Sequence, residues 1–119
     1  MRMSITLIAA ASALALSAPA FAKVIAVAPG DGAQARLQEA LIVAAPGDIV
    51  ELGAGRFQLS DGLSLDVKGV TLRGAGMDAT VLDFTGQQGS GEGLLVTSSD
   101  VTLRDFAVEN TKGDGIKSK

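Results

Sequence analysis

Residues 70–73 have the sequence Val-Thr-Leu-Arg, and the same four residues recur at 101–104. A second pattern recurs at the same interval: an acidic residue, Gly and an aliphatic residue occur at Asp61-Gly62-Leu63 and again at Glu92-Gly93-Leu94. The second pattern occurs a third time, at Asp114-Gly115-Ile116. Two different patterns that share one offset indicate a structural repeat.

The repeats define a longer interval, from position 61 to position 92, and a shorter one, from position 92 to position 114. A further match, Thr80…Asp83-Phe84 with Thr102…Asp105-Phe106, also has the shorter interval and implies a competing local register. We therefore expect a repeat of about 22 residues, with roughly nine extra residues in the longer interval. The polar, glycine-rich segment 85–93 is the expected insertion, because its composition is typical of a surface loop.

The repeats consist of short β-prone runs that are separated by Gly, Asp or Ser, a pattern typical of short strands. Antiparallel hairpins pair neighbouring runs and do not require identity one repeat later. In a parallel solenoid, each residue stacks on its equivalent in the next turn. The fold class expected is therefore all-β, and a coil of about 22 residues with three strands is typical of a β-helix. The runs are DIVEL, GRFQL, LSLDV, GVTLR, ATVLDF, GLLVT, DVTLR and FAVEN.

Upstream of the repeats, residues 33–44 are predicted to form one short helix that caps the stack. The apolar residues have helical spacing; they are Ala33, Leu37, Ala40, Leu41 and Ala44. Asp31 is the expected N-cap, because a carboxylate can accept hydrogen bonds from free amides of the first turn. Pro46-Gly47 is expected to end the helix.

The amino-terminal segment 1–22 has the three parts of a secretory signal peptide. Arg2 precedes an apolar run from Ile5 to Leu16, and Ala20-Phe21-Ala22 forms a small-residue cleavage site. The run is too short to span a bilayer comfortably. The alternative is a buried helix, which the absence of a polar face disfavours. Cleavage near Ala22 predicts a secreted or periplasmic protein, in which 23–47 form a leader strand and capping helix and 48–119 form β-helix coils.

Composition excludes several classes of function. The chain has ten Lys and Arg against 13 Asp and Glu, with a net charge of −3, and nucleic-acid binding requires a basic patch. Cys and His are absent, so disulfides, thiolate or imidazole metal sites and His-dependent nucleophilic catalysis are excluded within this chain. No second apolar segment is long enough for a membrane span. We expect no cofactor and no metal.

The combined pattern resembles the amino-terminal part of bacterial right-handed parallel β-helix proteins of the pectin-lyase-like superfamily, and more closely the secreted parallel β-helix repeat proteins. The residues that resemble the family are PGDIVELGAGRFQL (46–59), GVTLRGAG (69–76), DVTLRDFAVENT (100–111) and GDGIKSK (113–119). The resemblance covers the whole mature chain and is more specific for architecture than for chemistry. It implies a right-handed coil and an acidic polysaccharide as the partner.

Family members have many more coils than this sequence. A new coil opens at Gly113, without the atypical polar repeat that normally caps a solenoid. We therefore interpret the chain as an amino-terminal fragment of a longer protein. The alternative is a short protein that self-associates through its open carboxy-terminal coil.

Three acidic residues are candidates for chemistry because the repeat would stack them. Asp61, Glu92 and Asp114 would form an acidic ladder that could bind calcium through oxygen ligands. The favoured alternative is that each acid sits in a turn beside Gly and hydrogen-bonds local backbone. No catalytic residue is assigned.

Other residues receive structural or binding roles. Arg73 and Arg104 would stack as a basic pair that could contact an acidic sugar; the favoured alternative is two solvated outward positions. Asn110 is expected at a coil corner, where its amide satisfies bent backbone. The core candidates are Leu72, Leu82, Leu95, Leu103, Phe106 and Val108.

Two functions therefore remain open. In the first, the full-length protein binds or modifies an acidic polysaccharide as a lyase, epimerase or hydrolase. Such enzymes need a base and cations near a sugar carboxylate, or paired carboxylates. In the second, the protein is a non-catalytic secreted solenoid that serves as a binding, surface or assembly module. The fold alone does not decide between them.

Overall fold

The computed structural model describes residues 22–88 and 91–119. The predicted signal peptide, apart from Ala22, lies outside the described residues. The described chain is mostly β, with one helix, and every strand pair that forms its sheets is parallel.

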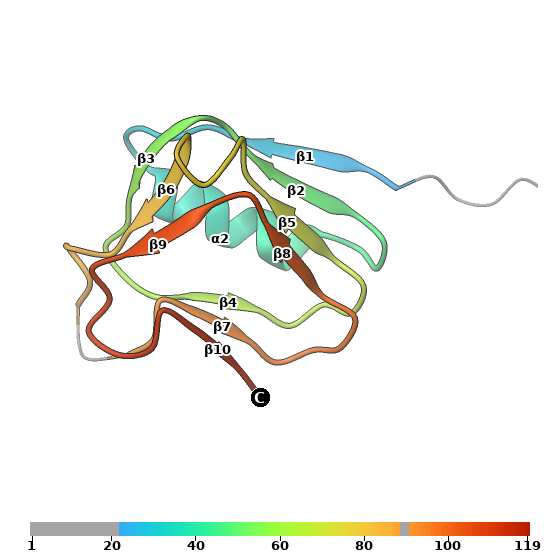
Figure 1. Ribbon diagram of the computed structural model, residues 1–119. Helices are drawn as coiled ribbons and strands as arrows, with labels where there is room; N and C mark the ends of the chain where they lie inside the picture. Colours follow the sequence, from blue (N-terminus) through green and yellow to red (C-terminus); the bar gives the residue numbers. More distant parts are fainter. Residues whose placement is uncertain (1–21, 89–90) are drawn as a thin grey trace, which may run out of the picture.

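The strands form three sheets, which the chain visits in the same order three times (Figure 1). Each run of the chain through the three sheets is called a passage. Strands of the second and third passages therefore lie beside their counterparts from the preceding passage. The first sheet contains β1 (Val24–Val27), β2 (Ile49–Leu52), β5 (Thr71–Arg73) and β8 (Thr102–Arg104). The second contains β3 (Gly55–Gln58), β6 (Thr80–Asp83) and β9 (Ala107–Glu109), and the third contains β4 (Leu63–Leu65), β7 (Leu94–Val96) and β10 (Ile116–Ser118).

The strand registers confirm two of the three sequence matches. Thr71 pairs with Thr102 in the first sheet, and Leu94 pairs with both Leu63 and Ile116 in the third. The third match is wrong: Val81 of β6 pairs with Ala107 of β9, so Thr80 and Thr102 belong to different sheets. The interval between paired positions of β6 and β9 is therefore longer than the one that the third match implies.

Two loops, not one, contain the extra residues of the second passage. The connection between the first and second sheets is 53–54 in the first passage but 74–79 in the second. The next connection lengthens from 59–62 to 84–93. The predicted insertion at 85–93 is therefore only part of the difference. The loop 74–79 folds against the strands through Thr80, whose hydroxyl donates to the Gly53 carbonyl and accepts from the Ala75 amide.

The helix α2 (Ala33–Val43) covers one end of the three sheets and confirms the predicted helix to within one residue. All five predicted apolar positions on the helix and at its end are buried. The predicted Asp31 cap is wrong, because the N-cap is Gly32 with φ 77° and makes no side-chain hydrogen bond. Among the described residues, no helix is long and apolar enough to cross a membrane.

Two glutamines of α2 form hydrogen bonds with the backbone at the edge of the third sheet, beneath the helix. The Gln38 side chain accepts from the Ser64 amide and donates to the Ser64 carbonyl, at 2.9 and 3.0 Å. Gln34 binds the amides of Ser60 and Asp61 and the carbonyl of Gly62 in the same way. These bonds satisfy backbone groups that would otherwise be free at the edge of the third sheet.

The core lies between the sheets and is made mainly of aliphatic side chains with two phenylalanines, Phe57 and Phe84. Leu72 and Leu82 are fully buried, as predicted. Leu103, Phe106 and Val108 pack against this core but are only partly buried. The prediction for Leu95 is wrong: it is only half-buried, between buried Leu94 and Val96, because alternate residues of a strand face opposite sides.

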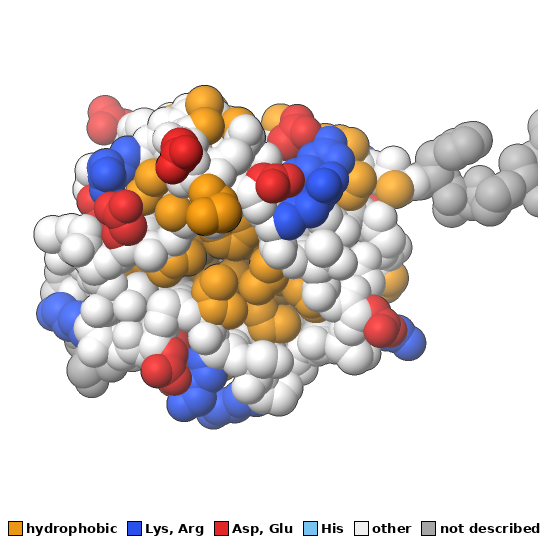
Figure 2. Space-filling model, viewed as in Figure 1, with side chains coloured by type: hydrophobic (Ala, Val, Ile, Leu, Met, Phe, Trp, Pro, Cys, Tyr) orange, Lys and Arg blue, Asp and Glu red, His pale blue; other side chains and the backbone are white. Residues whose placement is uncertain are grey.

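The third passage has an open face that is opposite to the helix-covered end. In Figure 2, apolar side chains form a patch at the centre of this face, between β8, β9 and β10. Their equivalents one passage earlier are covered by these strands. The patch therefore consists of inward-facing residues that lack a covering layer in the structure.

Candidate functional site

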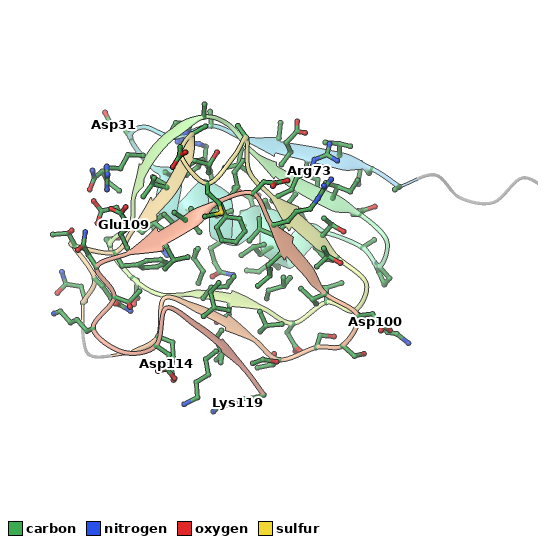
Figure 3. The ribbon with its side chains drawn as sticks, in the orientation of Figure 1. Asp31, Arg73, Asp100, Glu109, Asp114 and Lys119 are labelled. Carbon is green, nitrogen blue, oxygen red and sulfur yellow. The ribbon has the colours of Figure 1, made fainter. Side chains whose placement is uncertain are left out.

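The charged side chains lie on the outer faces of the sheets and in turns, and they do not converge on one centre. In Figure 3, Arg73, Glu109 and Asp114 project from three different sides of the molecule. The candidate sites are therefore two separate groups on two sheets, and each is described by itself.

The first group, called the Arg56 cluster, contains Arg56, Asp83, Thr85, Glu109 and Asn110 on the second sheet and the turns after it. Nη1 of Arg56 lies 2.9 Å from Oδ2 of Asp83 and 3.0 Å from Oε1 of Glu109. Arg56 thus bridges two acids from successive passages. Parallel pairing of Asp83 with Glu109 brings these carboxylates together, and the arginine between them offsets their repulsion.

Asp83 is the buried member of the Arg56 cluster, at 6% exposure. Its Oδ1 accepts hydrogen bonds from the Thr85 hydroxyl, the Thr85 amide and the Asn110 amide group, at 2.6, 2.9 and 3.0 Å. The bonds from Thr85 and Asn110, with that from Arg56, hold the pKa of Asp83 well below its ordinary value, against the opposing effect of burial. Hydrogen bonds to a carboxylate favour its charged form.

The chemistry of the Arg56 cluster follows from these contacts. Glu109 and, secondarily, Asp83 raise the pKa of Arg56, so the guanidinium and the Asp83 carboxylate are both charged at neutral pH. A general base works best with a pKa near the operating pH, and Asp83 lies far from that condition. The Arg56 cluster is therefore suited to fixing the corner of the second sheet and unsuited to moving a proton.

The second group lies on the outer face of the first sheet and contains Glu51, Arg73 and Arg104. Arg73 donates from Nε and Nη2 to Oε2 of Glu51, at 3.0 and 2.7 Å. Arg73 and Arg104 are direct register partners on adjacent parallel strands, which lie about 4.8 Å apart. Arg104 is half exposed, and its nearest carboxylate, on Asp105, is 3.6 Å away. The two arginines of the predicted basic pair are therefore adjacent to each other, and Glu51 binds one of them, Arg73.

Of the three predicted ladder acids, Asp61 and Glu92 have separate partners. Oδ1 of Asp61 accepts from the Gly62 amide at 2.8 Å, a local turn contact. Glu92 forms an ion pair with Lys117 at 3.1 Å, and its pKa is lowered first by a backbone hydrogen bond and then by Lys117. Within residues 22–88 and 91–119, no three acidic side chains are grouped closely enough to hold a metal ion. The geometry of the described residues therefore gives the calcium ladder no support.

Asn110 lies at a corner after β9, as its sequence position suggested. Its φ is 63°, in the left-handed region that asparagine tolerates better than most residues. The side-chain amide donates to the Asp83 carboxylate, not to backbone as expected. The corner residue and the buried acid of the preceding passage therefore stabilise each other.

Two shallow clefts lie apart from these groups. One of about 490 Å³ runs between β1 and α2 and is lined mainly by Ile25, Val27, Ala40 and Val43, with Arg36 and Glu39 also contributing. Another of about 360 Å³ lies beside the open face, lined by residues that include Val96, Asp100, Leu103 and Ile116. Neither cleft contains the Arg56 cluster or the Arg73–Arg104 pair.

Sequence reasoning missed the Arg56 cluster. Asp83 and Glu109 both follow an apolar strand residue, which is the only signal available. They are register partners on β6 and β9, but the interval between them matches neither of the repeats found in the sequence. Arg56 belongs to the first passage, on β3, and no sequence pattern links it to either acid.

Comparison with known proteins identifies no relative. No family model, curated protein or solved structure matches the chain.

Proposed function

We propose that the chain is the amino-terminal part of a right-handed parallel β-helix and that the complete, secreted protein binds or modifies an acidic polysaccharide. The observation on which the partner rests is the adjacency of Arg73 and Arg104 on one outer sheet face. Two guanidinium groups on neighbouring strands suit a polymer with a carboxylate on each sugar, because arginine binds carboxylates through paired N–H donors.

The architectural part of the proposal is supported by the repeated order of the three sheets. Three passages through the same sheets, all with parallel pairing, are the construction expected of a coiled solenoid. The secretory part is supported by the three-part pattern of residues 1–22. Residue Ala22 is exposed and precedes β1, so cleavage after it would leave the sheets intact.

Binding is better supported than catalysis for the described residues. Lyase or epimerase chemistry needs a base beside the sugar carboxylate, and Asp83 is held as a stable anion away from the arginine pair. Asp83 is therefore not the base that a lyase or epimerase would need beside the arginine pair.

The second candidate function is a non-catalytic solenoid that serves as a binding, surface or assembly module. The half-buried residues Leu103, Phe106 and Val108 on the open face favour it, because exposed apolar patches often mark interaction sites. In this case, self-association through the open face would be the main activity.

One experiment separates the two candidates. The secreted protein is incubated with alginate and with pectin, and binding and the formation of unsaturated sugar ends are measured. The first candidate predicts binding that weakens as salt is added and falls several-fold in Arg104→Ala. The matched control is Lys68→Ala, which removes a different exposed cation whose partner Asp100 is 3.9 Å away.

The outcomes have distinct meanings. Equal loss in both variants would indicate nonspecific attraction and contradict the arginine pair as the binding site. No binding and no turnover on either polymer, together with concentration-dependent assembly, would support the second candidate.

A further inference from the structure

Asp48 is a buried carboxylate that neither charged group includes. It is 5% exposed and immediately precedes β2. Among the ion pairs of the described residues, none gives Asp48 a Lys or Arg side chain as its partner. A buried charge normally requires compensation, so its hydrogen bonds are informative.

The two oxygens of Asp48 have different partners. Oδ2 accepts from the Ala45 amide at 2.9 Å, and the Asp48 amide donates to the Ala45 carbonyl at the same distance. This local turn fixes the carboxylate independently of the amino-terminal segment. Oδ1 accepts from the backbone nitrogen of Lys23 at 3.0 Å.

Lys23 is held in place from its other side as well. Its carbonyl accepts from the Ile49 amide at 2.9 Å, directly beside Asp48. Residue 23 is also the first residue after the predicted cleavage site at Ala22. The nitrogen that contacts Asp48 is therefore the atom that cleavage would convert from an amide into an amine.

We propose that Asp48 binds the α-ammonium group that signal peptide cleavage creates on Lys23. Hydrolysis of the Ala22–Lys23 bond by a peptidase consumes one water molecule. Ala22 keeps the new carboxylate, and the Lys23 nitrogen becomes an ammonium group at neutral pH. A neutral amide donor is thereby replaced by a cation at the same position, so that attraction between opposite charges is added to the hydrogen bond.

Two consequences follow. The mature protein is more stable than a form in which residue 23 is preceded by another residue, because only the mature form places a cation within hydrogen-bond distance of Asp48. Release of the leader then completes the fold at the free edge of the first sheet, where β1 pairs with β2. The proposal depends on the secretory part of the proposed function, so the two are tested separately.

The first test asks where the mature chain begins. Amino-terminal sequencing of the secreted protein is expected to give Lys23 as the first residue. A different first residue would overturn the proposed processing and with it the natural role of Asp48.

The second test measures the ion pair itself in chains that extend to Lys119. One chain begins at Lys23 with a free amine, one carries an acetylated Lys23 α-amine, and one begins at Ala22. Each is made with Asp48 and with Asp48→Asn, and thermal unfolding midpoints are compared at neutral pH. With Asp48 present, acetylation or retention of Ala22 is expected to lower the midpoint by about 5 °C or more.

In the Asp48→Asn background, the same changes are expected to shift the midpoint far less, because the anion is gone. Asp66→Asn is the matched control, since it removes an exposed carboxylate and should leave the effect of acetylation intact. Equal effects of acetylation with Asp48 and with Asp48→Asn, or no effect with Asp48, would overturn the proposal. The comparison uses the midpoint shift that acetylation causes within each background. It therefore holds even if Asp48→Asn lowers the midpoint by itself.

Discussion

At the residue scale, stability depends on a few polar side chains that connect successive passages of the chain. Asp83 receives hydrogen bonds from Arg56 in the preceding passage and from Asn110 in the following one. Thr80 links a long loop to the Gly53 carbonyl. Each contact joins residues from different passages, so its loss affects more than one strand.

Asp83→Asn tests the Arg56 cluster. We expect it to lower the free energy of unfolding at neutral pH by about 1–3 kcal/mol, because the donors from Thr85 and Arg56 lose an anionic acceptor. Urea unfolding at pH 7 measures the loss. Gln88→Ala is the control, since the Gln88 side chain makes a local hydrogen bond to the Gly86 carbonyl and is exposed.

The same variant gives a pH signature. The pKa of Asp83 is lowered in the folded state from an ordinary value of 3.8, so its stabilisation is present above about pH 4 and is lost as the pH falls below that value. The difference in unfolding free energy between wild type and Asp83→Asn should therefore shrink between pH 5 and about pH 2. A difference that is constant over this range would contradict the assigned role.

Asn110 provides a prediction about backbone conformation. Asn110→Ala and Asn110→Gly both remove the bond to Asp83, but only alanine is strained at φ 63°. We expect the alanine variant to be less stable than the glycine variant by about 1 kcal/mol. Equal stabilities in denaturant unfolding would show that the corner relaxes in one of the variants.

At the element scale, a glycine directly precedes each strand of the third sheet, at equivalent positions in the three passages. A Cβ atom on Gly93 would lie 2.7 Å from the Gly115 carbonyl oxygen, because the next passage crosses directly above it. The equivalent position in the last passage, Gly115, meets only Val108, at 3.5 Å. The acid-Gly-aliphatic repeat thus reflects close approach of successive backbones.

Gly93→Ala is expected to destabilise the chain by about 1–3 kcal/mol, because the backbone must shift to accommodate a methyl group. Gly91→Ala is the matched control, since no atom of the non-adjacent residues that the structure describes lies within 4 Å of its added Cβ. Thermal unfolding of the two variants gives the comparison. Equal midpoints would contradict the close stacking of β7 and β10.

At the scale of the whole molecule, the two ends of the three sheets differ. The α2 helix and its glutamines cover one end, whereas the open face leaves Leu103 partly exposed. Leu72 occupies the equivalent register position one passage earlier and is fully buried. Comparing the stability cost of truncating Leu103 with that of truncating Leu72 therefore indicates whether anything covers the open face.

For the isolated chain, we expect Leu72→Ala to cost about 2–5 kcal/mol of unfolding free energy and Leu103→Ala clearly less. Chemical denaturation of both variants measures the ratio. Similar costs, measured in the protein purified from its own cells, would show that a further layer buries Leu103 there. Sedimentation of the same sample would then distinguish a second copy from additional chain.

The sequence was informative where a residue type is required by local geometry. The helix and its buried face followed from the spacing of Leu37 and Leu41, and the strand registers of the first and third sheets followed from repeated words. The register of the second sheet could not be obtained in this way. Loops 74–79 and 84–93 lengthen the chain by different amounts. The sequence interval between β6 and β9 therefore matches no repeated motif.

The sequence by itself determined that short parallel strands repeat, because backbones that stack at fixed positions demand Gly and aliphatic residues there. Only the tertiary structure decided which oppositely charged residues meet. Arg56 meets Asp83 and Glu109, and Asp48 meets the nitrogen of Lys23, across separations that no local pattern encodes. The physical reason is that side-chain contacts between passages depend on loop lengths and strand stacking, whereas strand formation depends on neighbours along the chain.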